Sequence, residues 1–196
     1  MPYVLGIDEA GRGPLAGPVS VGVVRVQADF DRKFFKGIKD SKMLSSEERE
    51  LWFSLAKEAH KTGELDYAVA LISEKFIDKK GINAAISLGI KRCLARLGAG
   101  ETECHIFLDG GLKAPQKFPH QTTVIKGDEK IPVISLASIC AKVTRDRYMV
   151  RLSKKYPEYG FDEHKGYGTR KHKEALKKAG ASIVHRQSFL RNLTKG

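Results

Sequence analysis

The sequence lacks long apolar runs and paired cysteines, and each absence excludes a class of protein. No stretch approaches the roughly 18 consecutive apolar residues that a membrane-spanning helix needs, and the first residues carry no charged leader. The three cysteines are an odd number without Cys-x-x-Cys spacing, so neither a disulfide framework nor a zinc knuckle is indicated. Internal repeats and low-complexity tracts are also missing. We therefore expect a soluble, cytoplasmic protein.

Acidic residues are scarce in the second part of the chain. The 196 residues carry 35 Lys+Arg and 23 Asp+Glu, which gives a net charge of +12. Residues 1–112 contain 16 basic and 16 acidic side chains, whereas residues 113–196 contain 19 and 7, so the later part holds the whole excess. A basic face on one compact domain is typical of proteins that bind polyanions, although a solvated lysine-rich surface has the same composition.

Strand and helix patterns alternate along the chain, which predicts an α/β fold. Apolar and β-branched runs predict strands, the first two antiparallel, over residues 3–7, 18–26, 65–72, 104–109 and 122–125. Helical periodicity predicts helices that follow Ser45 and that span residues 74–97, 134–156 and 170–179. In the first helix Leu51, Leu55 and Ala59 recur along one face, and Ser45 and Glu48 have capping-box spacing.

The opening stretch, residues 6–18, combines acids with glycines. Asp8 and Glu9 end the first apolar run, and glycines at 11, 13 and 17 follow. Glycine lets a ligand approach the backbone N–H groups closely, and the fork of Arg12 suits a phosphate. An ordinary acidic turn after a strand would look similar. Because neighbours on a strand point to opposite faces, the backbone must bend if both acids reach one site.

Two further carboxylates stand out. Asp109 ends another apolar strand before a glycine, although Asp-Gly is also a common turn signal. Asp146 shares a helical face with Ile139, Val143 and Val150, where a carboxylate needs a cation or a donor. That partner is either Lys142, one turn earlier, or a metal site that contains the other acids.

Gathering four carboxylates without a cation would raise their pKa values by mutual repulsion. Oxygen ligands favour Mg²⁺ or Mn²⁺ over zinc. Beside a basic surface, such ions indicate phosphoryl chemistry, with two ions about 3.5–4 Å apart. The residues alone therefore predict metal-dependent phosphoryl transfer on nucleic acid.

Several motifs, in order along the chain, closely resemble those of ribonuclease HII. They are Ile7-Asp-Glu-Ala-Gly-Arg-Gly-Pro-Leu-Ala-Gly-Pro-Val19, Asp40-Ser-Lys42, Leu108-Asp-Gly110, Ala137-Ser-Ile-Cys-Ala-Lys-Val-Thr-Arg-Asp146 and His164-Lys-Gly-Tyr-Gly-Thr169. The resemblance implies a ribonuclease H-like α/β core with a mixed five-stranded sheet flanked by helices (residues 1–160). A C-terminal helical segment (residues 161–196) would complete the same structural unit and contribute to substrate binding.

The resemblance also implies roles for individual residues. Those matching the acidic metal-binding quartet are Asp8, Glu9, Asp109 and Asp146. The main chain of Gly11, Arg12 and Gly13 would contact the ribose 2′-OH and a phosphate, and Tyr167 would stack on the following deoxyribose. The expected further phosphate contacts are Lys42, Ser138, Lys142, His164 and Lys165, although His164 could equally be a surface-loop histidine. Gly168 stands where many members have proline.

The activity implied is metal-dependent endonucleolytic cleavage of RNA in RNA–DNA hybrids and 5′ of single ribonucleotides in duplex DNA, leaving 3′-hydroxyl and 5′-phosphate ends. The alternatives are a catalytically silent hybrid-binding protein and a nuclease that acts on all-DNA junctions. The basic helix at residues 170–179 is expected to grip the duplex. Family members are often monomers. A sliding-clamp partner is possible but not indicated, because residues 191–196 show no convincing clamp-binding peptide.

Overall fold

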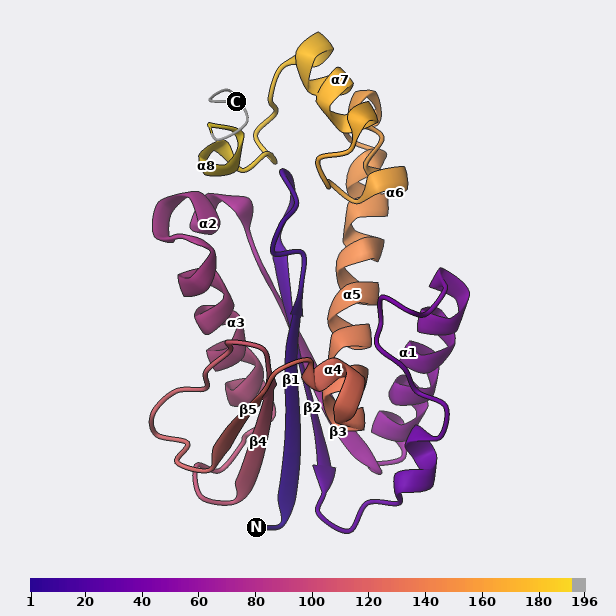
Figure 1. The fold of residues 1–196 in the computed structure, drawn as a ribbon, viewed down its shortest axis with the longest axis vertical. Helices are drawn as coiled ribbons and strands as arrows, with labels where there is room; N and C mark the ends of the chain where they lie inside the picture. Colours follow the sequence, from indigo (N-terminus) through magenta and orange to yellow (C-terminus); the bar gives the residue numbers. More distant parts are fainter. Residues whose placement is uncertain (192–196) are drawn as a thin grey trace.

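The computed structural model describes residues 1–191 and contains one mixed five-stranded sheet in the order β3-β2-β1-β4-β5 (Figure 1). Its strands are β1 (Tyr3–Ala10), β2 (Val19–Gln27), β3 (Leu65–Ile72), β4 (Cys104–Asp109) and β5 (Gln121–Val124). Strand β1 pairs antiparallel with β2 and parallel with β4, and β5 runs parallel to β4. The predicted strands and the antiparallel first pair are confirmed.

Helices cover both faces of the sheet. Those longer than one turn are α1 (Ser46–Lys61), α2 (Glu74–Lys80), α3 (Ile82–Arg96), α5 (Pro132–Ser153) and α7 (Arg170–Ala179). The short ones are η1 (Arg32–Phe35), α4 (Gly127–Lys130), η2 (Pro157–Tyr159), α6 (Phe161–His164) and α8 (Gln187–Leu190). Helices α2 and α3 pack on one face, α1 and α5 on the other, and α6 to α8 lie beyond the end of β1 (Figure 1). None of the helices within residues 1–191 is both long and apolar enough to span a membrane.

Two glycines bring helix α5 unusually close to the sheet. A Cβ atom on Gly6 of β1 would lie 2.4 Å from the Val133 carbonyl carbon, and one on Gly22 of β2 would lie 2.2 Å from the Ala137 oxygen. Real Cβ atoms do not approach backbone that closely, so these positions require glycine. The close contact holds α5, and α4 just before it, against the acidic end of β1.

The helix boundaries confirm some predictions and correct others. The capping box before α1 is present, with Glu48 N donating to Ser45 Oγ at 3.1 Å and Ser45 N donating to Glu48 Oε2 at 2.7 Å. The single helix predicted over residues 74–97 is wrong, because Gly81, with a φ of 83°, ends α2 and precedes α3. A side chain there would strain the backbone, and the glycine allows the chain to change direction.

The buried face of α1 also differs from the predicted one. Leu51 and Leu55 are 61% and 42% exposed, whereas Phe53 and Ala56 are buried together with the predicted Ala59. The larger Phe53 side chain packs against the core, and this rotates the leucines towards solvent. Periodicity alone did not distinguish the two faces.

Candidate active site

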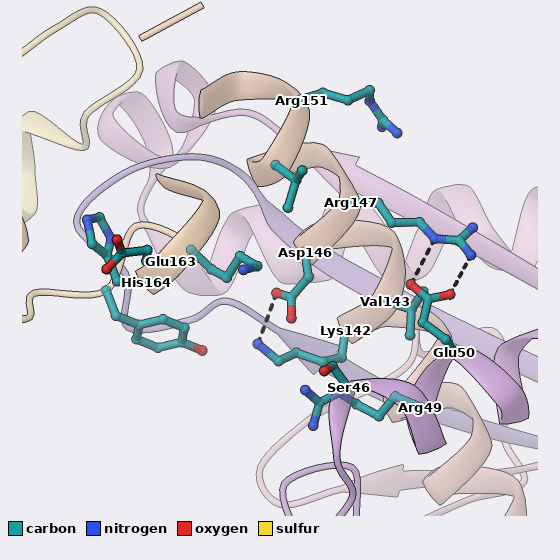
Figure 2. Close-up of a pocket in the computed structure, with 13 residues that line it drawn as sticks. Ser46, Arg49, Glu50, Lys142, Val143, Asp146, Arg147, Arg151, Glu163 and His164 are labelled. Carbon is teal, nitrogen blue, oxygen red and sulfur yellow. Dashed lines mark hydrogen bonds and ion pairs between the residues drawn. The ribbon is translucent and has the colours of Figure 1, made fainter. Parts of the chain in front are cut away.

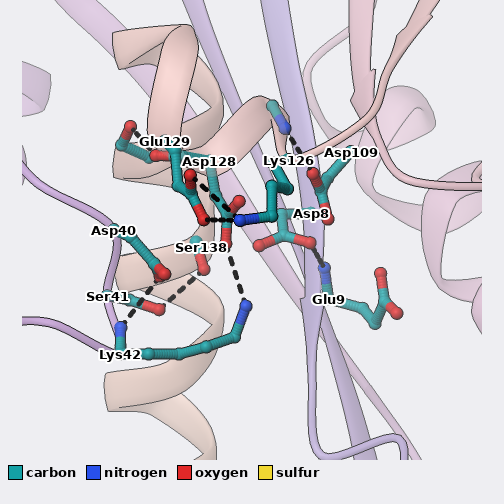
Figure 3. A network of polar contacts seen from close by, with 12 residues as sticks. Asp8, Glu9, Asp40, Ser41, Lys42, Asp109, Lys126, Asp128, Glu129 and Ser138 are labelled. Atoms are coloured by element: carbon teal, nitrogen blue, oxygen red, sulfur yellow. Dashed lines mark hydrogen bonds and ion pairs between the residues drawn. The ribbon is translucent and has the colours of Figure 1, made fainter.

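Three carboxylates meet near the sheet end at which β1 and β4 finish. Asp8, Asp109 and Asp128 each offer an oxygen, and these oxygens lie within 4.8 Å of one another (Figure 3). Strands β1 and β4 are parallel neighbours with Ile7 opposite Leu108, so the acids that follow emerge side by side. Asp128 comes from α4, which the packing of α5 on Gly6 holds nearby.

The environment of Asp8 disfavours an isolated negative charge. Its side chain is only 4% exposed, and this burial is the main cause that raises its pKa well above the usual value. The carboxylates of Glu9 and Asp109 raise the pKa further, whereas hydrogen bonds from Ser138 and from the Glu9 backbone N–H, the latter at 2.7 Å, act in the opposite direction. A cation bound by this carboxylate would replace the missing solvent.

The other two carboxylates are partly satisfied by their neighbours. Asp109 Oδ1 accepts a hydrogen bond from Gly127 N at 2.6 Å, and Asp128 Oδ2 lies 3.0 Å from Lys42 Nζ. Within residues 1–191, Lys42 is the only cation in an ion pair with the three acids. Three oxygen ligands with so little compensating charge fit a hard divalent ion such as Mg²⁺ or Mn²⁺.

The structure does not bring together the predicted quartet of acids. Asp8 and Asp109 lie together as predicted, but the Glu9 side chain points away from them (Figure 3). Its Oε1 lies 3.2 Å from Arg12 Nη1. The pairing of β1 with β2 continues regularly to Ala10, without the bend that would turn Glu9 to the face of Asp8.

Asp146 is also absent from this group of carboxylates. Its Oδ1 lies 2.9 Å from Lys142 Nζ, one helical turn away, which was the simpler of the two sequence-based explanations (Figure 2). Asp128 takes its place beside Asp8 and Asp109. A signal for Asp128 was present, because it follows a short strand and a glycine in Val124-Ile-Lys-Gly-Asp128. The lysines around it made it resemble an ordinary charged loop.

Two of the predicted phosphate-binding residues lie beside the carboxylates. Ser138 hydrogen-bonds with Asp8 and lies 2.9 Å, oxygen to oxygen, from Ser41, while Lys42 contacts Asp128. The lysine side chain is 77% exposed, so its ammonium group is accessible to a ligand that approaches the acids.

The other predicted contacts line a neighbouring cavity of about 780 Å³ between α1, α5 and α6. Lys142, Asp146, His164, Lys165 and Tyr167 all contribute to it. Arg147 and Arg151 of α5 and Arg49 of α1 also line it (Figure 2). Tyr167 is 40% exposed and its ring centre lies 5.6 Å from Lys142 Nζ. The lining is rich in basic and polar groups, which suits an anionic ligand.

His164 is not a free surface-loop residue. Its Nε2 lies 2.7 Å from the backbone oxygen of Tyr159, and its Nδ1 accepts a hydrogen bond from Gly166 N at 3.2 Å. The ring therefore shapes the turn that leads to Tyr167. Gly168, which stands where proline was expected from the resemblance, lies close to Leu15. A Cβ on Gly168 would lie 3.1 Å from Leu15 Cδ1, so this contact favours a small residue.

A buried pair of histidines supports the same turn. His185 Nδ1 accepts from Ser182 N at 3.0 Å, so its neutral ring carries its proton on Nε2, which lies 3.1 Å from His172 Nε2. His172 then donates from Nδ1 to the Tyr167 oxygen at 2.9 Å. Each of these three hydrogen bonds is made by an uncharged imidazole ring. Burial, together with His172, lowers the pKa of His185 to about 4.

We expect the protein to lose stability as the pH falls from about 6.5 to 4. In this range the unfolded chain binds a proton at position 185 that the folded protein does not bind, so protonation favours unfolding by up to about 3 kcal/mol. Urea unfolding at pH 7, 5.5 and 4.5 would measure the loss. His185→Gln should be less stable at pH 7 but should lose less stability on acidification, whereas His120→Gln, at an exposed position, should behave like the wild type. Parallel pH profiles for His185→Gln and the wild type would contradict the assignment.

Comparisons with known proteins agree with this architecture. The family model described as Ribonuclease HII matches residues 5–192. The chain is 45% identical to Ribonuclease HII of Caldicellulosiruptor bescii over 97% of this chain and 88% of that protein. The solved ribonuclease H2 of Pyrococcus horikoshii OT3 is similar with a TM-score of 0.74 and 29% identity, covering 98% and 97% of the two chains. A chain of the Archaeoglobus fulgidus PCNA:RNase HII complex has a TM-score of 0.75 and 30% identity, covering 94% of each chain. The expected ribonuclease H-like fold is confirmed.

Proposed function

The chain belongs to the ribonuclease HII family, and we propose that it cleaves the RNA strand of RNA–DNA hybrids and cuts 5′ of single ribonucleotides embedded in duplex DNA. The family membership makes it a ribonuclease H, a hydrolase that acts as an endoribonuclease. Cleavage leaves 3′-hydroxyl and 5′-phosphate ends. The observation that carries the proposal is the meeting of Asp8, Asp109 and Asp128 near the end of β1, the strand that leads into the loop beginning at Gly11.

Asp8, Asp109 and Asp128 would hold Mg²⁺ or Mn²⁺, with two ions in the catalytic complex. When bound, such ions supply an activated water and stabilise charge on the leaving oxygen. The protein's own residues orient the reaction. Ser138 and the Glu9 N–H hold the Asp8 carboxylate, Gly127 N holds that of Asp109, and Lys42 offers an exposed ammonium to a phosphate oxygen.

Substrate recognition would use the loop at Gly11, Arg12 and Gly13 together with Tyr167. Arg12 and Gly13 are exposed, and the Tyr167 ring is accessible for stacking on a sugar. A backbone contact to the 2′-OH would distinguish a ribonucleotide from a deoxyribonucleotide, since only the former has this group. Lys142, His164 and Lys165 line the adjacent cavity and would face the phosphates of the same duplex.

Helix α7 would contribute electrostatic binding to the duplex backbone. It is capped by Thr169, whose Oγ1 accepts from His172 N at 3.3 Å, and it ends at Gly180 as predicted. Its exposed basic residues are Arg170, Lys171, Lys173, Lys177 and Lys178. Contacts of this kind depend on salt and not on sequence.

The proposed partner is nucleic acid, bound by a monomer. The Archaeoglobus fulgidus relative was solved in a complex with PCNA. In this chain no convincing clamp-binding peptide is found in the sequence of residues 191–196. Of these, residues 192–196 lie outside the described residues. A clamp partner is therefore not part of the proposal.

Cleavage of a short DNA duplex that contains one ribonucleotide tests the proposal. With Mg²⁺ or Mn²⁺ we expect one cut on the 5′ side of the ribonucleotide, no cut with EDTA, and no cut in the same duplex made entirely of DNA. Analysis of the product ends would verify the 3′-hydroxyl and 5′-phosphate. Tight binding without metal-dependent turnover would instead identify a silent binding protein, and cleavage of all-DNA junctions would identify a nuclease with another substrate.

A further inference from the structure

Two arginines are completely buried beneath the loop of residues 11–18. Arg145 of α5 and Arg186, which immediately precedes α8, are both 0% exposed. Arginine is rarely buried without a carboxylate partner because its charge loses hydration. Here every hydrogen bond that the two guanidinium groups donate goes to a backbone carbonyl of the loop. Their positions therefore call for an explanation other than ion pairing.

Arg186 binds the first and the last parts of the loop at once. Its Nη2 donates to the Gly11 oxygen at 2.7 Å, its Nη1 to the Arg12 oxygen at 2.9 Å and its Nε to the Gly17 oxygen at 2.9 Å. Its backbone N also donates to the Leu15 oxygen at 2.7 Å. One residue of the C-terminal segment thus holds four carbonyl groups of a loop that lies far from it in sequence.

Arg145 completes this arrangement from the other side. Its Nε donates to the Pro18 oxygen at 2.8 Å and its Nη2 to the Ala16 oxygen at 3.2 Å. Its Nη1 is buried and has no hydrogen-bond partner among the described residues. A Cβ on Gly11 would lie 2.0 Å from Arg145 Nε, so the loop rests directly on this side chain.

These contacts orient the backbone of the loop. The carbonyls of Gly11 and Arg12 point inward to Arg186, whereas none of the hydrogen bonds found within residues 1–191 uses the N–H of Arg12 or Gly13 as donor. Both residues are exposed. In a trans peptide group the carbonyl of one residue and the N–H of the next point in opposite directions. Anchoring the Gly11 and Arg12 oxygens inward therefore directs the N–H groups of Arg12 and Gly13 outward, where a ligand can reach them.

The two guanidinium groups also place positive charge under the loop. The carboxylates of Glu74 and Asp78 near Arg186, and of Asp146 near Arg145, offset this charge in part, but none forms an ion pair with either arginine within residues 1–191. Buried charges are screened less by salt than exposed ones, so they contribute more to the potential at an adjacent anion site. Burial and the neighbouring Arg145 lower the pKa of Arg186 to about 9, which still leaves the side chain protonated at neutral pH. The Arg145 Cζ atom lies 5.8 Å from the centre of the Tyr167 ring, so the same cation contacts the second recognition element.

We propose that Arg145 and Arg186 are positioning residues for ribonucleotide recognition: they hold the loop with its N–H groups facing the substrate, and their charge attracts the phosphate next to the ribonucleotide. The proposal rests on the proposed function for the substrate it names. It concerns binding and discrimination, because neither arginine contacts Asp8, Asp109 or Asp128 in the described structure.

The test compares Arg145→Lys and Arg186→Lys with Arg145→Met and Arg186→Met. Lysine retains the charge but loses the planar fork that reaches several carbonyls, whereas methionine loses both. We expect the lysine variants to raise KM for the ribonucleotide-containing duplex at least about tenfold, with kcat within about threefold of the wild type, because charge-assisted hydrogen bonds are lost on the binding side. The methionine variants should also weaken the dependence of duplex binding on salt.

Two measurements separate positioning from a general loss of stability. Fluorescence anisotropy in EDTA should show that the variants lose the preference for the ribonucleotide-containing duplex over the all-DNA duplex. Amide hydrogen exchange should become faster in a peptide that covers residues 10–18, in the absence of any substrate. Arg92→Met, which removes an exposed arginine of α3, serves as the control and should change none of these quantities.

The outcomes are distinct. A lower melting temperature with unchanged KM, unchanged preference and unchanged exchange in residues 10–18 would show that the arginines are merely structural, and would overturn the proposal. If the wild type itself did not distinguish the two duplexes, the proposed function would fail. In that case faster exchange in the loop and a weaker salt dependence of all-DNA binding would still support the positioning role, and their absence would refute it.

Discussion

Replacing Asp8 by asparagine is expected to reduce metal-dependent cleavage by about a thousandfold or more. The substitution keeps the size of the side chain but removes the charge from a carboxylate that is only 4% exposed and lies among the three gathered acids. An amide is a weak ligand for a hard divalent ion, so both the binding of the ion and its placement suffer. Single-turnover cleavage of the ribonucleotide-containing duplex in Mg²⁺ and in Mn²⁺ measures the effect.

The same variant should be more stable than the wild type when no metal is present. The raised pKa of Asp8 means that its ionised form opposes folding at neutral pH, an effect that is absent at pH values below the ordinary pKa of aspartate and grows as the pH rises. Asp8→Asn removes this effect. Thermal unfolding in EDTA at pH 7.5 would reveal the gain.

Metal should reverse the order of stability. Wild-type protein should gain about 2.7 kcal/mol at a metal concentration one hundred times Kd, whereas Asp8→Asn should gain much less. The exposed Asp29→Asn is a matched control and should resemble the wild type in both assays. An Asp8→Asn enzyme that cleaves normally, or that is stabilised by Mg²⁺ as strongly as the wild type, would rule out this carboxylate as a metal ligand.

The second large effect should distinguish Asp128 from Asp146. Asp128→Asn should lower kcat by about a thousandfold, since its oxygen lies within 4.8 Å of those of Asp8 and Asp109. Asp146→Asn should lower kcat less than about tenfold, because the carboxylate pairs with Lys142 beside the neighbouring cavity. Steady-state kinetics of both variants, with a titration of Mn²⁺, makes the comparison.

The two substitutions are chemically identical, so each is the control for the other. Asp146→Asn frees Lys142, and any effect should therefore appear in KM and in the salt dependence of binding, not in the requirement for metal. A large loss of kcat for Asp146→Asn with an active Asp128→Asn enzyme would restore the acidic quartet predicted from the sequence and would contradict the assignment of Asp128.

Local patterns were sufficient for most of the secondary structure. The strands were predicted from apolar and β-branched runs, and the capping box of α1 and both ends of α7 from residues close in sequence; all of these are confirmed. Errors arose where burial selected between similar patterns. On α1, packing of Phe53 placed Leu51 and Leu55 in solvent, and at Gly81 a single positive φ divided the predicted helix.

The sequence by itself determined the class of fold and the family, and its resemblance to ribonuclease HII predicted that Asp8 and Asp109 lie in one site. In the structure the parallel pairing of β1 with β4 brings these two acids to the same edge of the sheet. Only the tertiary structure decided which carboxylate joins them. Asp128 reaches Asp8 because Gly6 and Gly22 allow α5 to pack close to the sheet, a contact between segments more than 100 residues apart. The same holds for Arg186, which binds a loop about 170 residues earlier in the chain. Spacing along the chain carries no information about such contacts, which depend on how whole elements pack.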